Sequence, residues 1–231
     1  MPSRASRKRI LVNRLRAIFK DPISGLTHLA SALAALVGGA VLVLAGPSSG
    51  LARLALLAYS LTLVLLFIAS ATYHLFKTSP GREQLLRKLD HTAIFLLIAG
   101  TYTPVCAIVL SGGWRWGLLA AVWALAAAGI VFKLFFIRAP RWVSVGIYLA
   151  MGWLGVVGLG PLFQALPWPA VAWLLGGGLL YTAGAIVYGT RRLDFFPGTF
   201  GFHEVWHLFV TAASAAHYVF VLIYVAPLGL R

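Results

Sequence analysis

The stretch LALLAYSLTLVLLFIASATYHLF, residues 54–76, decides the fold, because it contains no Asp, Glu, Lys or Arg. A helix needs about 20 such residues to cross the roughly 30 Å hydrocarbon core of a bilayer. Backbone N–H and C=O groups in lipid must satisfy one another, and one long uninterrupted run does so as a helix. We therefore predict a transmembrane helix here, with Ser70 and His74 as polar exceptions near its end.

The rest of the chain repeats this pattern. Apolar residues make up 61% and charged residues 10% of the sequence, whereas about a quarter of the residues of a soluble domain are charged. Seven apolar runs are predicted to cross the membrane: 23–45, 52–76, 90–111, 115–137, 142–163, 168–189 and 203–227. We expect an all-α integral membrane protein, with a basic N-terminal arm at 1–22 and a seven-transmembrane helix bundle at 23–231. Cys106 is the only cysteine, which excludes an internal disulfide framework.

The basic residues predict the orientation of the bundle. Sixteen of the 19 Lys and Arg fall in the N-terminal arm and in alternate loops on one side. Only Arg53, Arg115 and Arg231 fall on the other side. Lys and Arg are retained on the cytoplasmic side of a membrane, so we predict a cytoplasmic N-terminus and a C-terminus outside. We expect the arm to contact anionic lipid head groups, and we expect no nucleic acid partner, because no base-stacking or DNA-binding motif accompanies the arm.

Ionisable side chains in membrane helices are candidates for a functional site, because burying them is costly. Ser70 and His74 end the second run, Asp90 begins the third, and His203 and His207 begin the seventh. Helix counting puts all five at the cytoplasmic level. Three imidazoles with an open position make a catalytic zinc site, and a nearby carboxylate can take a proton from water. The alternative is a set of interfacial histidines, and spacing does not show that the three helices are neighbours.

Residues 203–207 also read H-E-x-x-H, the zinc signature of many metalloproteases. A protease needs a third ligand further along the chain, where only His217 is available. At 1.5 Å per residue, His217 lies about 15 Å beyond His207, too far to share a metal. The role of Glu204 stays open between a second base, a partner for a nearby arginine and a solvated side chain. His28 is expected to be interfacial, and His217 to bond across helices or to line an inner cavity.

Three blocks carry a family resemblance: SATYHLF, LDHTAIFLLIAGTYTP and GFHEVWHLFVTAASAAHYVFV. Together they resemble the hemolysin III family, within the progestin and adipoQ receptor superfamily that includes the adiponectin receptors. The resemblance implies a protein of the plasma (inner) membrane with zinc inside the bundle. By this resemblance His74, His203 and His207 look like the zinc ligands. Asp90 looks like the carboxylate that holds the catalytic water, and Ser70 like its hydrogen-bonding neighbour.

The resemblance leaves three functions open. The first is a zinc-dependent hydrolase of lipid amide or ester bonds, similar to a ceramidase, with a membrane lipid as substrate inside the bundle. The second is a non-enzymatic protein of membrane homeostasis that holds structural zinc. The third is a pore-forming cytolysin, for which we find no continuous polar track in the sequence. The sequence does not indicate an oligomeric state.

Overall fold

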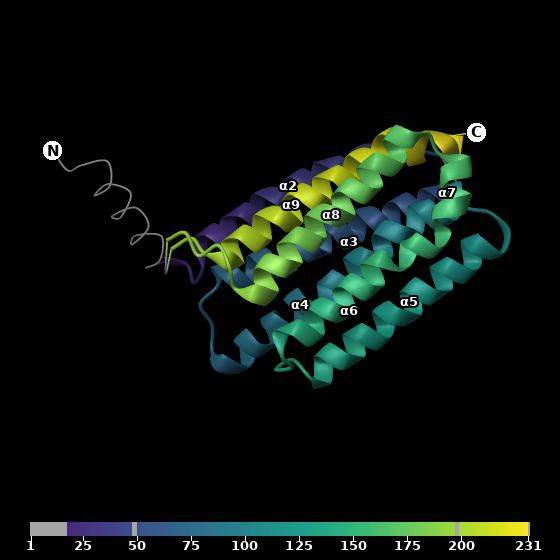
Figure 1. Ribbon diagram of the computed structural model, residues 1–231. Coiled ribbons are helices and arrows are strands. Elements are labelled where there is room, and N and C mark those ends of the chain that lie inside the picture. The colour runs from purple at the N-terminus through teal and green to yellow at the C-terminus, as the bar shows by residue number, and fades with distance from the viewer. Residues whose placement is uncertain (1–17, 48–49, 197–198, 231) are drawn as a thin grey trace.

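The computed structural model describes residues 18–47, 50–196 and 199–230, and the described residues form helices and no strands (Figure 1). The helical elements are α2 (Pro22–Ala45), α3 (Gly50–Leu75), α4 (Pro80–Pro104), η1 (Val105–Val109), α5 (Gly112–Phe135), α6 (Arg141–Trp153), η2 (Leu154–Gly158), α7 (Leu159–Ala165), α8 (Trp168–Thr190), α9 (Phe202–Phe220), η3 (Val221–Val225) and η4 (Ala226–Leu230). The predicted arm falls mostly on residues 1–17, which lie outside the described residues.

Among the described residues, seven spans are long and apolar enough to cross a membrane, as predicted. Many of their large apolar side chains face outward, among them Leu33 and Leu44 of α2 and Leu54 of α3. Such exposure would be unfavourable in water and suits contact with lipid. The protein is therefore a multi-pass integral membrane protein whose helices contact membrane lipids.

The third span begins earlier than the sequence predicts. We expected it at residue 90, but α4 starts at Pro80. Proline suits the first helical turn because its fixed φ matches the helix and its missing N–H would be unpaired there. The turns before Asp90 are largely polar or exposed, so hydropathy could not reveal them.

The fifth span is interrupted between α6 and α7 by the 3₁₀ segment η2. At this break the Tyr102 hydroxyl, from α4, donates to the Gly152 carbonyl and accepts from the Gly155 N–H, both at 2.6 Å. A break in a membrane helix frees backbone groups that need new partners. The hydroxyl of Tyr102 supplies one partner to the end of α6 and one to η2.

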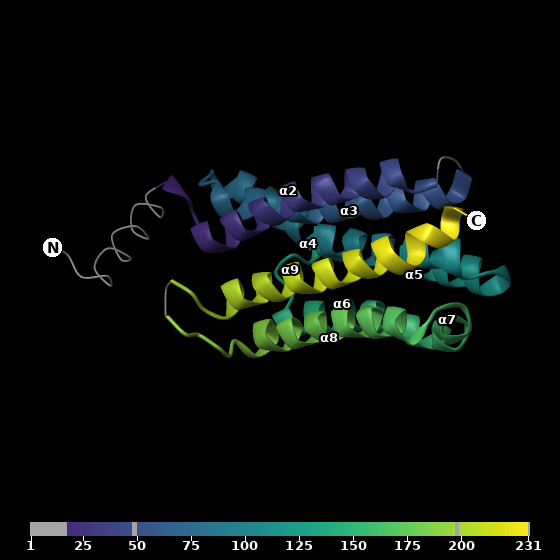
Figure 2. The ribbon, with the colours of Figure 1, turned by 90° about the horizontal axis from the view of Figure 1, so that it is seen from above.

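The last long helix, α9, lies between two parts of the bundle. It packs along α8 and against α2, while α3 packs between α2 and α4. Figure 2 shows α9 between the α2–α3 pair and the α6–α8 pair. Because the helices alternate in direction, one end of the bundle collects Pro22, Leu75, Pro80, Phe135, Arg141, Thr190 and Phe202. We call this the basic end.

Candidate metal centre

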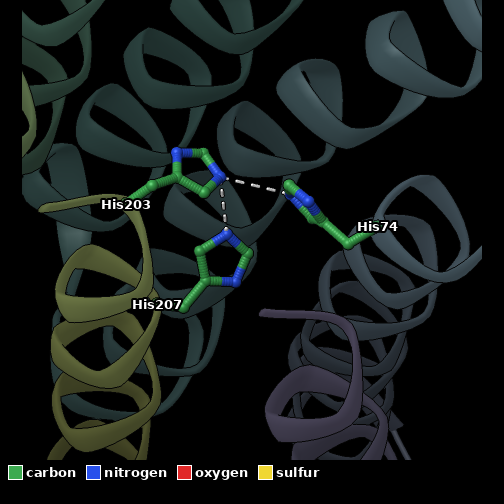
Figure 3. Close-up of side chains that lie close together, drawn as sticks. All are labelled: His74, His203 and His207. Carbon is green, nitrogen blue, oxygen red and sulfur yellow. Dashed lines mark hydrogen bonds between the residues drawn. The ribbon is translucent and has the colours of Figure 1, made fainter. Parts of the chain in front are cut away.

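Three histidines meet inside the basic end. His74 lies in the last turn of α3, and His203 and His207 lie one turn apart at the start of α9. The Nε2 atom of His203 is 3.4 Å from Nε2 of His74 and 3.2 Å from Nε2 of His207 (Figure 3). One ligand atom from each of the three residues fits within 4.8 Å of the others.

These distances fit a small tetrahedral cation. Zinc binds histidine nitrogen at about 2.0–2.1 Å, so two ligands at a tetrahedral angle stand about 3.3 Å apart. The two Nε2–Nε2 distances of 3.4 and 3.2 Å lie on either side of that value. Three neutral imidazoles leave a fourth position open, which is the donor set of catalytic zinc sites. The three side chains could therefore hold a metal ion.

Asp21 fixes the orientation of one of these rings, and the sequence did not point to it. The Nδ1–H of His74 donates to Oδ2 of Asp21 at 3.0 Å, so the lone pair of the ring is on Nε2, toward the other histidines. The Asp21 N–H also donates to the His74 carbonyl at 2.7 Å. Burial alone would raise the pKa of the Asp21 carboxyl, but the hydrogen bond and the charge interaction with His74 lower it overall. A carboxylate behind a metal-binding histidine is a common supporting partner.

His28 also belongs to this cluster, although we expected it to be interfacial. It is only 3% exposed, and its ring centroid lies 4.0 Å from that of His207. Its Nε2–H donates to the His207 carbonyl at 3.3 Å. The expectation was wrong because α2 packs against α9, so a residue near the start of α2 is enclosed by neighbouring helices instead of facing head groups.

The structure also brings Asp90 and Ser70 near the histidines. Ser70 is a polar neighbour of the Asp90 carboxylate, and Nδ1 of His91 lies 3.4 Å from Oδ2 of Asp90. Ser70 and Asp90 line the same cavity as His203 and His207. The last turns of α3, the middle of α4 and the start of α9 thus line one space, which spacing alone could not show.

Glu204, the acidic residue of the H-E-x-x-H sequence, faces away from this space. Its Oε2 accepts a hydrogen bond from the Gly201 N–H at 2.8 Å, which caps the start of α9. Its Oε1 lies 3.5 Å from the Ser24 hydroxyl. Glu204 does not line the cavity, so its position matches a helix cap and not the general base of a metalloprotease.

The cavity runs from the histidines toward the middle of the bundle. Its walls are mainly apolar side chains of α4, α6, α8 and α9, and it reaches His217. The His217 Nε2–H donates to the Leu174 carbonyl of α8 at 3.0 Å, so His217 both bonds across helices and lines the cavity. Helical rise puts it about 15 Å from His207, long enough for a stretch of acyl chain.

Comparison with known proteins gives the family. The sequence profile described as haemolysin-III related matches residues 16–218. The chain belongs to the haemolysin III family. It is 38% identical to Hemolysin-3 of Bacillus cereus over 219 residues, which are 94% of this chain and 97% of that protein. More distant similarity places the haemolysin III family within the progestin and adipoQ receptor superfamily.

Two animal proteins represent that wider similarity. The chain is 27% identical to the human monocyte to macrophage differentiation factor over 168 residues, which are 69% of this chain and 66% of that protein. It is 30% identical to the adiponectin receptor protein of Drosophila melanogaster over 151 residues, 58% of this chain and 34% of that protein. The match to the haemolysin III profile includes α3, α4 and most of α9, and so all the residues of the candidate metal centre.

Proposed function

We propose that the protein is a zinc-dependent hydrolase of a lipid amide or ester bond. The observation that carries the proposal is the meeting of three imidazoles, with two Nε2–Nε2 pairs at tetrahedral spacing, beside an apolar cavity that also contains a carboxylate. His74, His203 and His207 would hold the metal. A membrane lipid would enter the cavity sideways between helices and place its carbonyl at the histidines.

The remaining residues would do the proton chemistry. When bound, zinc supplies Lewis acidity that activates water and polarises a carbonyl oxygen. Asp90 accepts the proton of the attacking water and returns it to the leaving amine or alkoxide. Ser70 donates its hydroxyl hydrogen to Asp90 and so holds the carboxylate in place. The apolar walls exclude bulk water, which strengthens these charge interactions.

Replacing Asp90 tests the reaction separately from metal binding. Asp90→Asn should keep bound zinc, because the three histidines are untouched, and should lose at least about a hundredfold in turnover, within the range for a general base. The purified protein would be given a mixture of bacterial membrane lipids and N-acyl lipids, with products measured by mass spectrometry. Asp194→Asn is the matched control, because Asp194 is exposed outside the cavity.

Two results would contradict the proposal, one for the role of Asp90 and one for the metal ligands. Turnover by Asp90→Asn at the rate of the unmodified protein would remove Asp90 from the reaction. Metal content by elemental analysis should fall in His203→Ala and stay in His217→Gln, where the amide can still donate to Leu174. Equal zinc in these two variants would contradict the proposed ligands.

A structural role for the metal is the second candidate. His74 is on α3, whereas His203 and His207 are on α9, and α9 packs mainly against α8 and α2. A metal at the three histidines would therefore clamp two helices that have little direct contact. In this case chelation should lower the thermal unfolding midpoint, and no lipid would be hydrolysed by the zinc-loaded protein.

A further inference from the structure

A second group of charged side chains lies at the basic end, apart from the three histidines. It consists of Arg87 on α4, Lys133 on α5 and Arg141 on α6, which we call the cation cluster. Lys133 is only 2% exposed, and its Nζ donates to the Ser144 hydroxyl. Ser144 follows Arg141 by one helical turn, so the two side chains of α6 are neighbours. Arg87 is an electrostatic neighbour of Lys133.

Arg141 has unused hydrogen-bonding capacity. Its Cζ lies 5.4 Å from the centre of the Tyr188 ring and 5.3 Å from that of Phe202. Its Nη1 is buried and has no hydrogen-bond partner in the structure. A guanidinium group carries five donors in a planar fork that matches phosphate and carboxylate oxygens. The stacked Arg141 is therefore held in place with donors available for an anion.

Among the described residues, no ion pair joins a carboxylate to this cluster. The chain contains five Asp and Glu residues in all. Three of them form the ion pairs found among the described residues, with Lys20, His74 and His91. The other two are Glu204, which caps α9, and Asp194, which is exposed in a loop. A buried ammonium group whose only partner is a neutral hydroxyl is costly unless an anion from outside pairs with it.

We propose that the cation cluster binds the phosphate of an anionic phospholipid from the leaflet at the basic end. Lys133 lies in the last turn of α5 and Arg141 begins α6, so both residues are at the ends of membrane spans, where we expect lipid phosphates. Basic sites between transmembrane helices bind anionic head groups in this way. The site adjoins the cavity, because Tyr188, on which Arg141 stacks, also lines it. The binding does not require that this lipid is hydrolysed.

Lipid retention by the full-length protein tests this site. The protein in neutral-detergent micelles would be titrated with dioleoyl phosphatidylglycerol or dioleoyl phosphatidylcholine, and bound lipid counted by native mass spectrometry. We expect one phosphatidylglycerol to bind, weakening with added salt, and phosphatidylcholine to bind at least about tenfold more weakly, because its choline is repelled by the cluster. Equal affinity for the two lipids would overturn the proposal.

Variants locate the site. Arg141→Gln and Lys133→Met should each weaken phosphatidylglycerol binding roughly tenfold, as expected for the loss of a charge-assisted hydrogen bond. Arg141→Lys keeps the charge but loses the planar fork and the aromatic contacts, so its affinity should fall between those of Arg141→Gln and the unmodified protein. Partial retention would guard against misfolding as the cause of the loss in Arg141→Gln. The matched control is Arg192→Gln, an exposed residue, which should leave binding unchanged. Unchanged binding in both Arg141→Gln and Lys133→Met would refute the assignment.

Free phosphate in solution could also supply the anion that the cation cluster binds. Inorganic phosphate at millimolar concentration should neither displace phosphatidylglycerol nor raise the thermal unfolding midpoint, if the acyl chains contribute to binding. Displacement by phosphate at that concentration would instead make the site one for a free anion, and would overturn the lipid assignment.

Discussion

At the scale of single residues, the candidate metal centre depends on how each ring is held. His74 has its tautomer set by Asp21, and His28 packs against the ring of His207. Both supporting residues lie at the start of the chain, far in sequence from the rings they support. Their contribution is to reduce the freedom of the imidazoles before a metal arrives.

Asp21→Ala should weaken zinc binding by about 10–100-fold, the usual effect of losing a partner behind a metal ligand. Asp21→Asn should lose less, because the amide oxygen can still accept the proton of His74 Nδ1. Competition with a chromophoric zinc chelator measures the affinity. Glu83→Ala serves as the control, since Glu83 is at the same end and pairs with Lys20 at 2.8 Å, outside the centre. If both alanine variants bound zinc equally, Asp21 would have no supporting role.

The sequence pointed to the three histidines of the candidate metal centre but not to the residues that hold their rings in place. His74, His203 and His207 could be selected because ionisable groups are unusual in apolar helices, and the structure brings all three together. Asp21 lies just outside a span in a charged arm, where a carboxylate is unremarkable. His28 looked interfacial because its environment depends on helix packing, which no local pattern encodes.

At the scale of elements, glycine determines how closely helices approach. A Cβ at Gly129 of α5 would overlap the ring of Phe95, which is fully buried on α4. At Gly117, on the same helix, a Cβ would meet nothing within 4 Å. Small residues at such contacts let helix backbones come together in lipid.

Gly129→Ala should therefore destabilise the protein by about 1–3 kcal/mol, the cost of overpacking a close contact. Gly117→Ala is the matched control and should be neutral or slightly stabilising, because alanine favours the helix over glycine. Thermal unfolding in detergent micelles measures both. The same unfolding midpoint for the two variants would show that α4 and α5 can move apart at Gly129 without loss of stability.

Span number and type could be predicted because hydropathy in lipid is a local property of the chain. The start of α4 was missed by ten residues, since its first turns carry Arg82, Glu83, Arg87 and Lys88 and extend beyond the apolar run. The break in the fifth span was also missed, because the contact with Tyr102 that satisfies it comes from another helix.

At the scale of the whole molecule, the basic end sets the predicted orientation. With Cys106 replaced by alanine, single cysteines at Ser79 and Ser111 would report opposite ends, since both positions are exposed. By the distribution of Lys and Arg, Ser111→Cys should react with an impermeant maleimide in intact cells, and Ser79→Cys only after permeabilisation. The reverse pattern would invert the bundle and put the metal centre on the outer side.

The interruption of the fifth span has a mechanical consequence. The hydroxyl of Tyr102 bonds to both the end of α6 and η2, and the same tyrosine forms part of the cavity wall. An acyl tail that displaced Tyr102 would break its hydrogen bonds to the Gly152 carbonyl and the Gly155 N–H together, and α6 could then bend relative to η2. Entry of a lipid tail into the cavity and bending of the fifth span would then be coupled through the Tyr102 hydroxyl.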